Sequence, residues 1–190
     1  MNAILEAALE VQAFCSARGW RFCVIGAIAV QRWGEPRLTQ DVDVTVLSGF
    51  GSEAEFVDAL LSGYRGRIPD ARAFALRHRV VLLESRSAVP IDVALGGIPF
   101  EERVVARAST FDVGGPEPLL TCSAEDLVVL KTFASRDKDW IDVEGIVTRQ
   151  GERLDTALVL RELEPLLDLR DDTHSLPRLQ AILESAGPED

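Results

Sequence analysis

A short apolar segment, a glycine and a second apolar segment constrain the fold of this chain most. Residues 20–25 are mainly apolar and are typical of a strand, and Gly26 interrupts them. Residues 27–33 have helical spacing, and residues 42–47 read as the next strand. This order of strand, glycine turn, short helix and strand predicts a mixed α/β unit at the start of the chain.

Two aspartates, Asp41 and Asp43, lie at the start of the second strand. Because successive strand side chains alternate between faces, both carboxylates are expected on one face of the sheet. The valines between and after them are then expected in a core. Adjacent carboxylates repel each other unless a cation lies between them. A hard divalent metal such as Mg²⁺ is the usual partner, because it binds oxygen ligands.

A third aspartate, Asp92, lies in the apolar segment of residues 90–95. Burying this carboxylate without a partner would be costly, and a shared metal with Asp41 and Asp43 explains it. The alternative is that Asp92 faces solvent on an alternating strand. Three strand carboxylates around two metal ions suit phosphoryl or nucleotidyl transfer, in which negative charge gathers on phosphate oxygens.

Gly26 fits the same chemistry. A glycine between a strand and a helix lets the backbone approach a phosphate, and the helix then offers free N–H groups to the anion. Taken alone, a single glycine such as Gly26 is a weak signal and favours a simple tight turn. Its place upstream of the Asp-x-Asp strand favours the phosphate interpretation.

The spacing of apolar residues predicts an α/β part over residues 1–115 and a helical part over 116–190. Helices are expected over 2–18, from 52 to about 61, and over 124–135, 137–149, 155–169 and 176–185. Strands are expected over 72–85 and 91–95 as an antiparallel pair, with an edge strand at 109–113. Residues 101–107 are ambiguous. Composition predicts disorder only after Gly187.

The formal net charge of −11 argues against a protein that coats nucleic acid through its overall field. Arginines are concentrated between residues 62 and 86, which predicts either a local surface for a polyanion such as an RNA end or a solvated loop. The acidic residues after Glu152 favour a role in solubility over the binding of a basic protein partner. The three cysteines form no close pair, and no membrane span or signal peptide is evident, so we expect a cytoplasmic protein.

These motifs resemble the DNA polymerase β-like nucleotidyltransferase superfamily. The matching elements are the Gly26-Ala27 turn, the Asp41-x-Asp43 strand and Asp92. The motif Arg37-x-Thr39-x-Asp41 is similar to a motif of the AbiEii-type abortive-infection toxins and of related toxins that modify transfer RNA. Lys131 and the segment 136–142 resemble the later helices of that family. The likeness implies a small mixed sheet with flanking helices, followed by a C-terminal helical subdomain.

The resemblance also implies roles for individual residues. Asp41 and Asp43 would hold two Mg²⁺ or Mn²⁺ ions, and Asp92 would share one ion and accept the proton of the acceptor hydroxyl. The other residues implied in nucleotide binding are Gly26, Ala27, Arg37, Thr39, Lys131 and Asp139. Ala27 departs from the family, which has serine or glycine there. Lys131 reads equally as an ordinary surface lysine, and Asp139 as part of a charged helix start.

The implied function is transfer of a nucleoside monophosphate from a nucleoside triphosphate to a hydroxyl. The acceptor is expected to be RNA, such as a tRNA 3′ end, a protein or a small molecule. The resemblance alone implies a toxin with an antitoxin partner. The alternative is a non-catalytic member of the same fold that binds a nucleotide or a partner protein.

Overall fold

The computed structural model describes residues 2–185, so the disorder expected after Gly187 lies outside the described residues. The chain forms two compact units, residues 1–28 with 38–122 and residues 29–37 with 123–190. The helix α2 (Gly26–Trp33) begins in the first unit and ends in the second. The division expected at residue 115 stays a prediction.

One mixed seven-stranded sheet forms the first unit within the described residues, in the order β3-β4-β5-β2-β1-β7-β6. Its central strands β2 and β5 run parallel, whereas β1 and β4 run antiparallel to β2 and β5, respectively. The mixed α/β fold class is therefore confirmed. The strands are β1 (Phe22–Ile25), β2 (Val42–Leu47), β3 (Arg65–Gly66), β4 (Val80–Glu84), β5 (Pro90–Gly96), β6 (Ser109–Phe111) and β7 (Leu119–Thr121).

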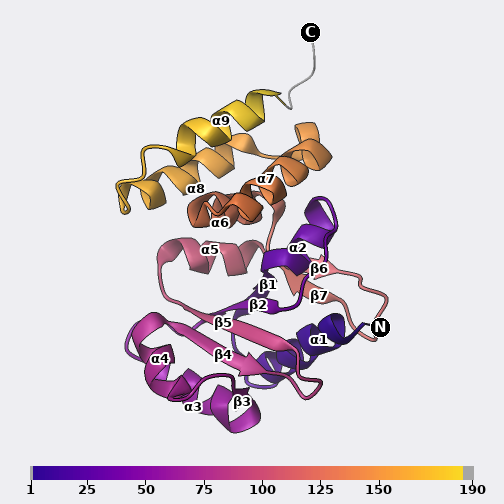
Figure 1. The fold of residues 1–190 in the computed structure, drawn as a ribbon, viewed down its shortest axis with the longest axis vertical. Coiled ribbons are helices and arrows are strands. Elements are labelled where there is room, and N and C mark those ends of the chain that lie inside the picture. The colour runs from indigo at the N-terminus through magenta and orange to yellow at the C-terminus, as the bar shows by residue number, and fades with distance from the viewer. Residues whose placement is uncertain (1, 186–190) are drawn as a thin grey trace. The chain divides into compact units, whose positions relative to one another are not determined.

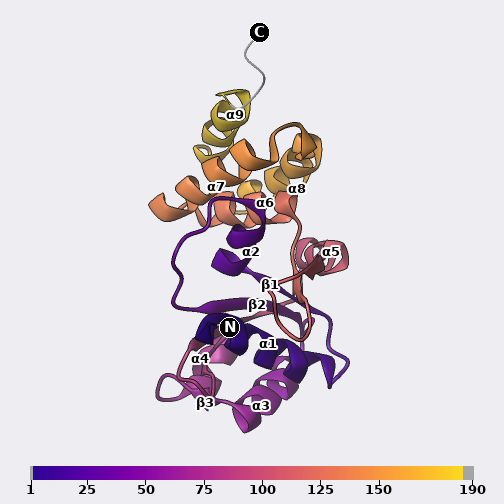
Figure 2. The same ribbon diagram turned by 90° about the vertical axis from the view of Figure 1, so that its right-hand side faces the viewer.

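Helices cover both faces of this sheet. Figure 1 and Figure 2 show α1 (Ala3–Ser16), α3 (Glu53–Gly63) and α4 (Ala71–His78) on one side, and α5 (Pro99–Arg107) on the other. The first face is the hydrophobic core, to which the strands contribute buried aliphatic side chains: Val24, Val44, Val81, Leu83, Ile91 and Val93. Burial at every second strand position leaves the alternate positions for polar side chains on the other face.

The second unit is helical in its described part. It contains α6 (Ala124–Ala134), α7 (Asp137–Gln150), a short 3₁₀ turn (Gly151–Arg153), α8 (Thr156–Asp168) and α9 (Ser175–Ser185). Its buried side chains recur at helical spacing: Leu127, Trp140, Val143, Ile146, Val159, Leu163 and Leu179. Ser123 begins α6 as predicted, since its hydroxyl accepts a hydrogen bond from the Asp126 amide.

The strand predicted over residues 72–85 is wrong in its first part, whereas its second part is the strand β4, which pairs antiparallel with β5 as predicted. Residues 71–78 form the helix α4, and the strand β4 begins only at Val80. The alternation of arginine with apolar residues there resembles a strand, but alanine, leucine and arginine are strong helix formers. The ambiguous segment after residue 98 is helical, because the Glu101 carboxylate accepts hydrogen bonds from the Gly97 and Ile98 amides and caps α5.

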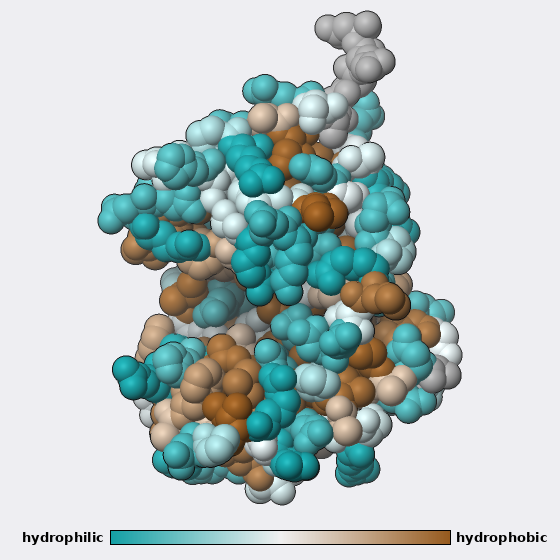
Figure 3. Space-filling view, in the orientation of Figure 1, coloured by the Kyte–Doolittle hydropathy of each residue, from teal (hydrophilic) through white to brown (hydrophobic). Residues whose placement is uncertain are grey.

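All three cysteines are buried, and none of them forms a disulfide within the described part of the chain. In the part of the chain that the structure describes, none of the helices has the length and apolar character needed to cross a membrane. On the face drawn in Figure 3, hydrophobic residues lie among hydrophilic ones in the part of the molecule that contains β4 and β5.

Candidate functional site

Asp43 and Asp92 lie side by side on the central strands of the sheet. They are register partners on the parallel strands β2 and β5, so their side chains leave the sheet on the same face. Both are half-buried, whereas the valines beside them are fully buried on the opposite face. Asp92 therefore lies on a partly exposed face of the sheet, and Asp43 lies on that same face. The pairing of β2 with β5 brings together these two carboxylates, which are 49 residues apart in the sequence.

Asp41 directly precedes β2, and Thr39 holds its carboxylate. The Thr39 hydroxyl donates a hydrogen bond of 2.8 Å to Asp41 Oδ1. This contact places Thr39 beside the Asp41 carboxylate. Its expected role in nucleotide binding stays a prediction.

Gly26 lies directly against Asp43. Its predecessor Ile25 is the register partner of Asp43, and Gly26 has a positive φ of 65°. A Cβ atom on residue 26 would lie 1.9 Å from Asp43 Oδ2 and 2.6 Å from Asp43 Cγ. Glycine is therefore needed twice, for the left-handed backbone and for the space that the carboxylate occupies. The start of α2 meets a negative charge, as its dipole favours.

Ala27 is buried, with 5% of its surface exposed. Its methyl group belongs to the interior, so any contact with a ligand would use its backbone N–H. The hydroxyl that a serine would provide is absent, and the predicted role of Ala27 in nucleotide binding is limited to the backbone.

An arginine that sequence reasoning missed contacts the third carboxylate. Arg67 donates a hydrogen bond to Asp92 Oδ1 and forms an ion pair with it. Burial raises the pKa of the Asp92 carboxyl above its ordinary value. The Arg67 guanidinium opposes that shift and the charge of Asp41 adds to it, so the pKa of Asp92 remains raised. A raised pKa makes the Asp92 carboxylate a better proton acceptor than an ordinary aspartate.

The second unit holds a separate network of buried ion pairs. Lys131 Nζ lies 3.0 Å from Asp139 Oδ1 and 2.8 Å from Asp142 Oδ2, and only 6% of Lys131 is exposed. Arg37 binds Asp142 with two hydrogen bonds, of 2.7 and 2.9 Å. Arg136 Nε lies 2.5 Å from Asp139 Oδ2. The predicted residues Lys131, Arg37 and Asp139 are thus brought together, and Asp142 and Arg136 complete the set.

These cations determine how the two acids ionise. Burial acts to raise the pKa of Asp139 and of Asp142, but the hydrogen bonds and charges of their partners outweigh it. Arg136 and Lys131 lower the pKa of Asp139, while Arg37 and Lys131 lower that of Asp142. Both acids are therefore ionised at neutral pH. The expected nucleotide contacts of this cluster stay predictions.

The three carboxylates of the first unit have the chemistry of a metal site. Asp43 and Asp92 offer oxygen ligands from one face, and the charge of Asp41 is felt at Asp92. Within residues 2–185, however, no three Asp, Glu, His or Cys side chains are gathered into a complete ligand set. Two of the carboxylates have partners of their own: Thr39 donates a hydrogen bond to Asp41, and Arg67 pairs with Asp92. The ligand types fit Mg²⁺ or Mn²⁺.

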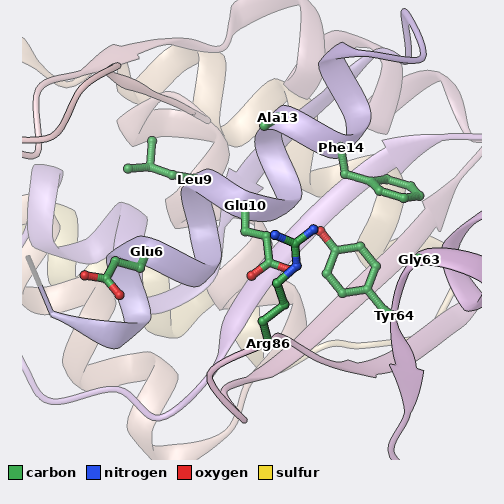
Figure 4. A pocket seen from close by; sticks show the side chains of 8 residues that line it. All are labelled: Glu6, Leu9, Glu10, Ala13, Phe14, Gly63, Tyr64 and Arg86. Atoms are coloured by element: carbon green, nitrogen blue, oxygen red, sulfur yellow. The ribbon is translucent and has the colours of Figure 1, made fainter.

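A surface cavity of about 630 Å³ lies elsewhere in the first unit. Figure 4 shows Glu10, Tyr64 and Arg86 pointing toward one another in it, with the remaining lining from α1 and Gly63. Burial raises the pKa of the Tyr64 hydroxyl, and the charge of Glu10 adds to the effect. None of the residues predicted from the sequence lines this cavity.

No family model matches the chain, and no curated protein matches its sequence. Solved structures do match it. An antigenic nucleotidyltransferase-like protein from Paracoccidioides brasiliensis superimposes with a TM-score of 0.51 at 14% identity, covering 98% of this chain and 93% of that one. The antibiotic-resistance factor ANT(2'')-Ia gives a TM-score of 0.51 at 15% identity, covering 94% and 95%. At such low identity the likeness concerns the fold alone, and the chain has a nucleotidyltransferase-like fold.

Proposed function

We propose that this chain is a metal-dependent nucleotidyltransferase that moves a nucleoside monophosphate from a nucleoside triphosphate to a hydroxyl acceptor. The observation that carries this proposal is the register pairing of Asp43 with Asp92, with the Asp43 carboxylate in the space that a side chain at Gly26 would fill. The fold shared with nucleotidyltransferase-like structures supports it.

Asp41, Asp43 and Asp92 would hold Mg²⁺ or Mn²⁺. Such ions neutralise the charge that develops on the triphosphate and lower the pKa of an attacking hydroxyl. Asp92 would accept the proton of the acceptor hydroxyl, because its side chain leaves the sheet on the same face as Asp43. Thr39 keeps the Asp41 carboxylate oriented.

The backbone N–H groups after Gly26 are proposed to bind the triphosphate, as a helix start favours an anion. Lys131 is proposed to contact the β- and γ-phosphates, with Arg37 and Asp139 in support. For this, Lys131 Nζ would exchange one of its two ion pairs for a phosphate oxygen. Such an exchange keeps the buried ammonium paired throughout.

The test is transfer of label from each of the four α-³²P-labelled nucleoside triphosphates to RNA, protein and small hydroxyl compounds in the presence of Mg²⁺. We expect transfer by the wild type and by the control variant Glu117→Gln, which changes an exposed residue outside the carboxylate site. We expect a loss of at least about a hundredfold for Asp43→Asn, because it removes charge that acts on the transition state. Equal labelling by wild type and Asp43→Asn in every combination would refute the enzymatic proposal.

A second candidate is a non-catalytic nucleotide-binding protein. The buried methyl of Ala27 and the ion pair that occupies Asp92 favour it. Calorimetry separates the two functions. Tight nucleotide binding that ignores Mg²⁺, without turnover, supports the binding protein, whereas turnover that requires Mg²⁺ eliminates it.

The narrower AbiEii-type likeness, and with it a toxin that modifies transfer RNA, rests on the sequence motifs. We propose growth arrest on expression as its test, with Asp43→Asn as the control. Unimpaired growth at high expression, with no partner protein present, counts against a toxin and leaves the transfer activity to be judged by the labelling assay.

A further inference from the structure

Arg67 is fixed in place by the sheet. It follows β3, and its backbone N–H donates a hydrogen bond of 3.0 Å to the carbonyl of Leu82 on β4. Leu82 is the register partner of Asp92 on β5. The strand β4 therefore lies between Arg67 and Asp92, and the Arg67 side chain extends across β4 to that carboxylate.

We propose that Arg67 is an internal cation that holds Asp92 when no metal is bound and is displaced from it by a divalent metal. Arg67 is thus a positioning residue that sets the metal affinity of the carboxylate site. The inference rests on the proposed function, because it requires Asp92 to be a metal ligand.

Charge explains why a cation is needed there. Asp92 lies next to Asp43 in register, and the charge of Asp41 also reaches it. Without a cation, these like charges repel one another at a half-buried position. A guanidinium provides one positive charge and two directed donors, and a divalent metal provides two charges at the same oxygens. A metal ion bound at Asp92 would lie beside the guanidinium, and the two cations repel each other.

The exposure of the pair makes the exchange feasible. The Arg67 side chain is 29% exposed and that of Asp92 is 32% exposed. A displaced guanidinium can therefore be hydrated, and no buried charge is left unpaired. The Lys131 pairs differ, because Asp139 and Asp142 are almost completely buried. Metal-driven exchange is accordingly expected at Arg67.

The neighbouring arginine provides a matched control. Arg65 lies two residues earlier, is 83% exposed, and forms an ion pair of 3.3 Å with Glu84 in place of Asp92. Removing its charge alters the same sheet edge without touching the carboxylate site. A comparison of variants at Arg65 and Arg67 therefore distinguishes competition for Asp92 from the general effect of lowering the positive charge nearby.

The experiment measures Mn²⁺ binding to the full chain from the electron paramagnetic resonance signal of free Mn²⁺. We expect Arg67→Gln to bind Mn²⁺ roughly fivefold more tightly than the wild type, which is the scale of one half-exposed charge-assisted pair. Arg65→Gln is expected to bind like the wild type. In the Asp92→Asn background, Arg67→Gln should change the affinity by less than about twofold, because the contested ligand is gone.

A second measurement uses the unaltered protein. In ¹⁵N spectra, the side-chain N–H signal of Arg67, assigned by its absence in Arg67→Lys, should shift on addition of Mg²⁺, while that of Arg65 stays fixed. This readout holds even where Arg67→Gln does not fold. Two results overturn this inference alone. The first is that the wild type binds Mn²⁺ and Arg67→Gln binds it equally or more weakly. The second is that the Arg67 signal does not shift at saturating Mg²⁺. Failure of both proteins to bind Mn²⁺ overturns the proposed function with it.

Discussion

At the scale of single residues, two glycines with the same backbone conformation separate strain from crowding. Gly19 and Gly26 both have a φ of 65°, but a Cβ at residue 19 would meet nothing within 4 Å. At residue 26 it would fall on Asp43. Gly19→Ala is therefore expected to cost about 1 to 3 kcal/mol from the positive φ alone.

Gly26→Ala is expected to lower the free energy of unfolding by about 1 to 3 kcal/mol more than Gly19→Ala, because the methyl forces the Asp43 carboxylate aside. It should also weaken Mg²⁺ binding, which Gly19→Ala leaves unchanged. Urea unfolding and Mg²⁺ calorimetry on both variants measure this. Equal destabilisation by the two variants, with equal Mg²⁺ affinity, would contradict the crowding argument.

The individual residues also show how far sequence reasoning reaches. The period of two along a strand predicts Asp41 and Asp43 on one face, although β2 begins only at Val42, and the apolar neighbours of Asp92 singled out that carboxylate. Arg67 could not be assigned to Asp92, since they are 25 residues apart and an arginine-rich segment offers several candidates. The partners of Lys131 could not be predicted either, because they lie on α7 and depend on how α6 and α7 cross, which the spacing of residues in the sequence does not determine.

At the scale of elements, long apolar patterns were more informative than short ones. The helices α6 to α9 agree with the sequence pattern to within about two residues, because each buries a continuous stripe. The short strands β3 and β7 were missed, since two or three residues carry no period. The helix α4 was misread because it buries little besides Ala75 and so lacks an apolar stripe.

The helices α6 and α7 are joined by buried charges, and this predicts an acid-sensitive stability. The pKa values of Asp139 and Asp142 lie below the ordinary value of 3.8. Their contribution is therefore fully present above pH 3.8 and is lost as pH falls through the lowered pKa values. We expect Asp142→Asn to be about 3 kcal/mol less stable than the wild type at pH 7, and the difference to narrow in acid.

Urea unfolding between pH 7 and pH 2.5 measures this difference. The exposed Glu144 lies on the same helix, so Glu144→Gln is the matched control and should remain within about 0.5 kcal/mol of the wild type at every pH. A gap between Asp142→Asn and the wild type that stays constant into strong acid would show that the ionised pair is not its source.

At the scale of the whole molecule, the arginine-rich segment between residues 62 and 86 is largely neutralised. Five of its arginines pair with carboxylates: Arg65 with Glu84, Arg67 with Asp92, Arg72 with Asp58, Arg79 with Glu53 and Arg86 with Glu10. Local charge clustering in a sequence thus becomes a set of ion pairs once the chain folds. Together with the net charge of −11, this leaves a triphosphate little general attraction to the protein.

A nucleotide should therefore stabilise this molecule only together with a divalent metal. At a concentration of about 100 times its dissociation constant, a ligand adds about 2.7 kcal/mol to the free energy of unfolding. For a chain of 190 residues this raises the melting temperature by about 5 to 10 °C. We expect that rise with Mg²⁺ and a non-hydrolysable nucleoside triphosphate together, and at most about 1 °C with the nucleotide alone. Glu117→Gln should keep the full rise and Asp43→Asn should lose it, because only the latter changes the carboxylate site. An equal rise in Asp43→Asn would mean that the nucleotide binds somewhere other than these three aspartates.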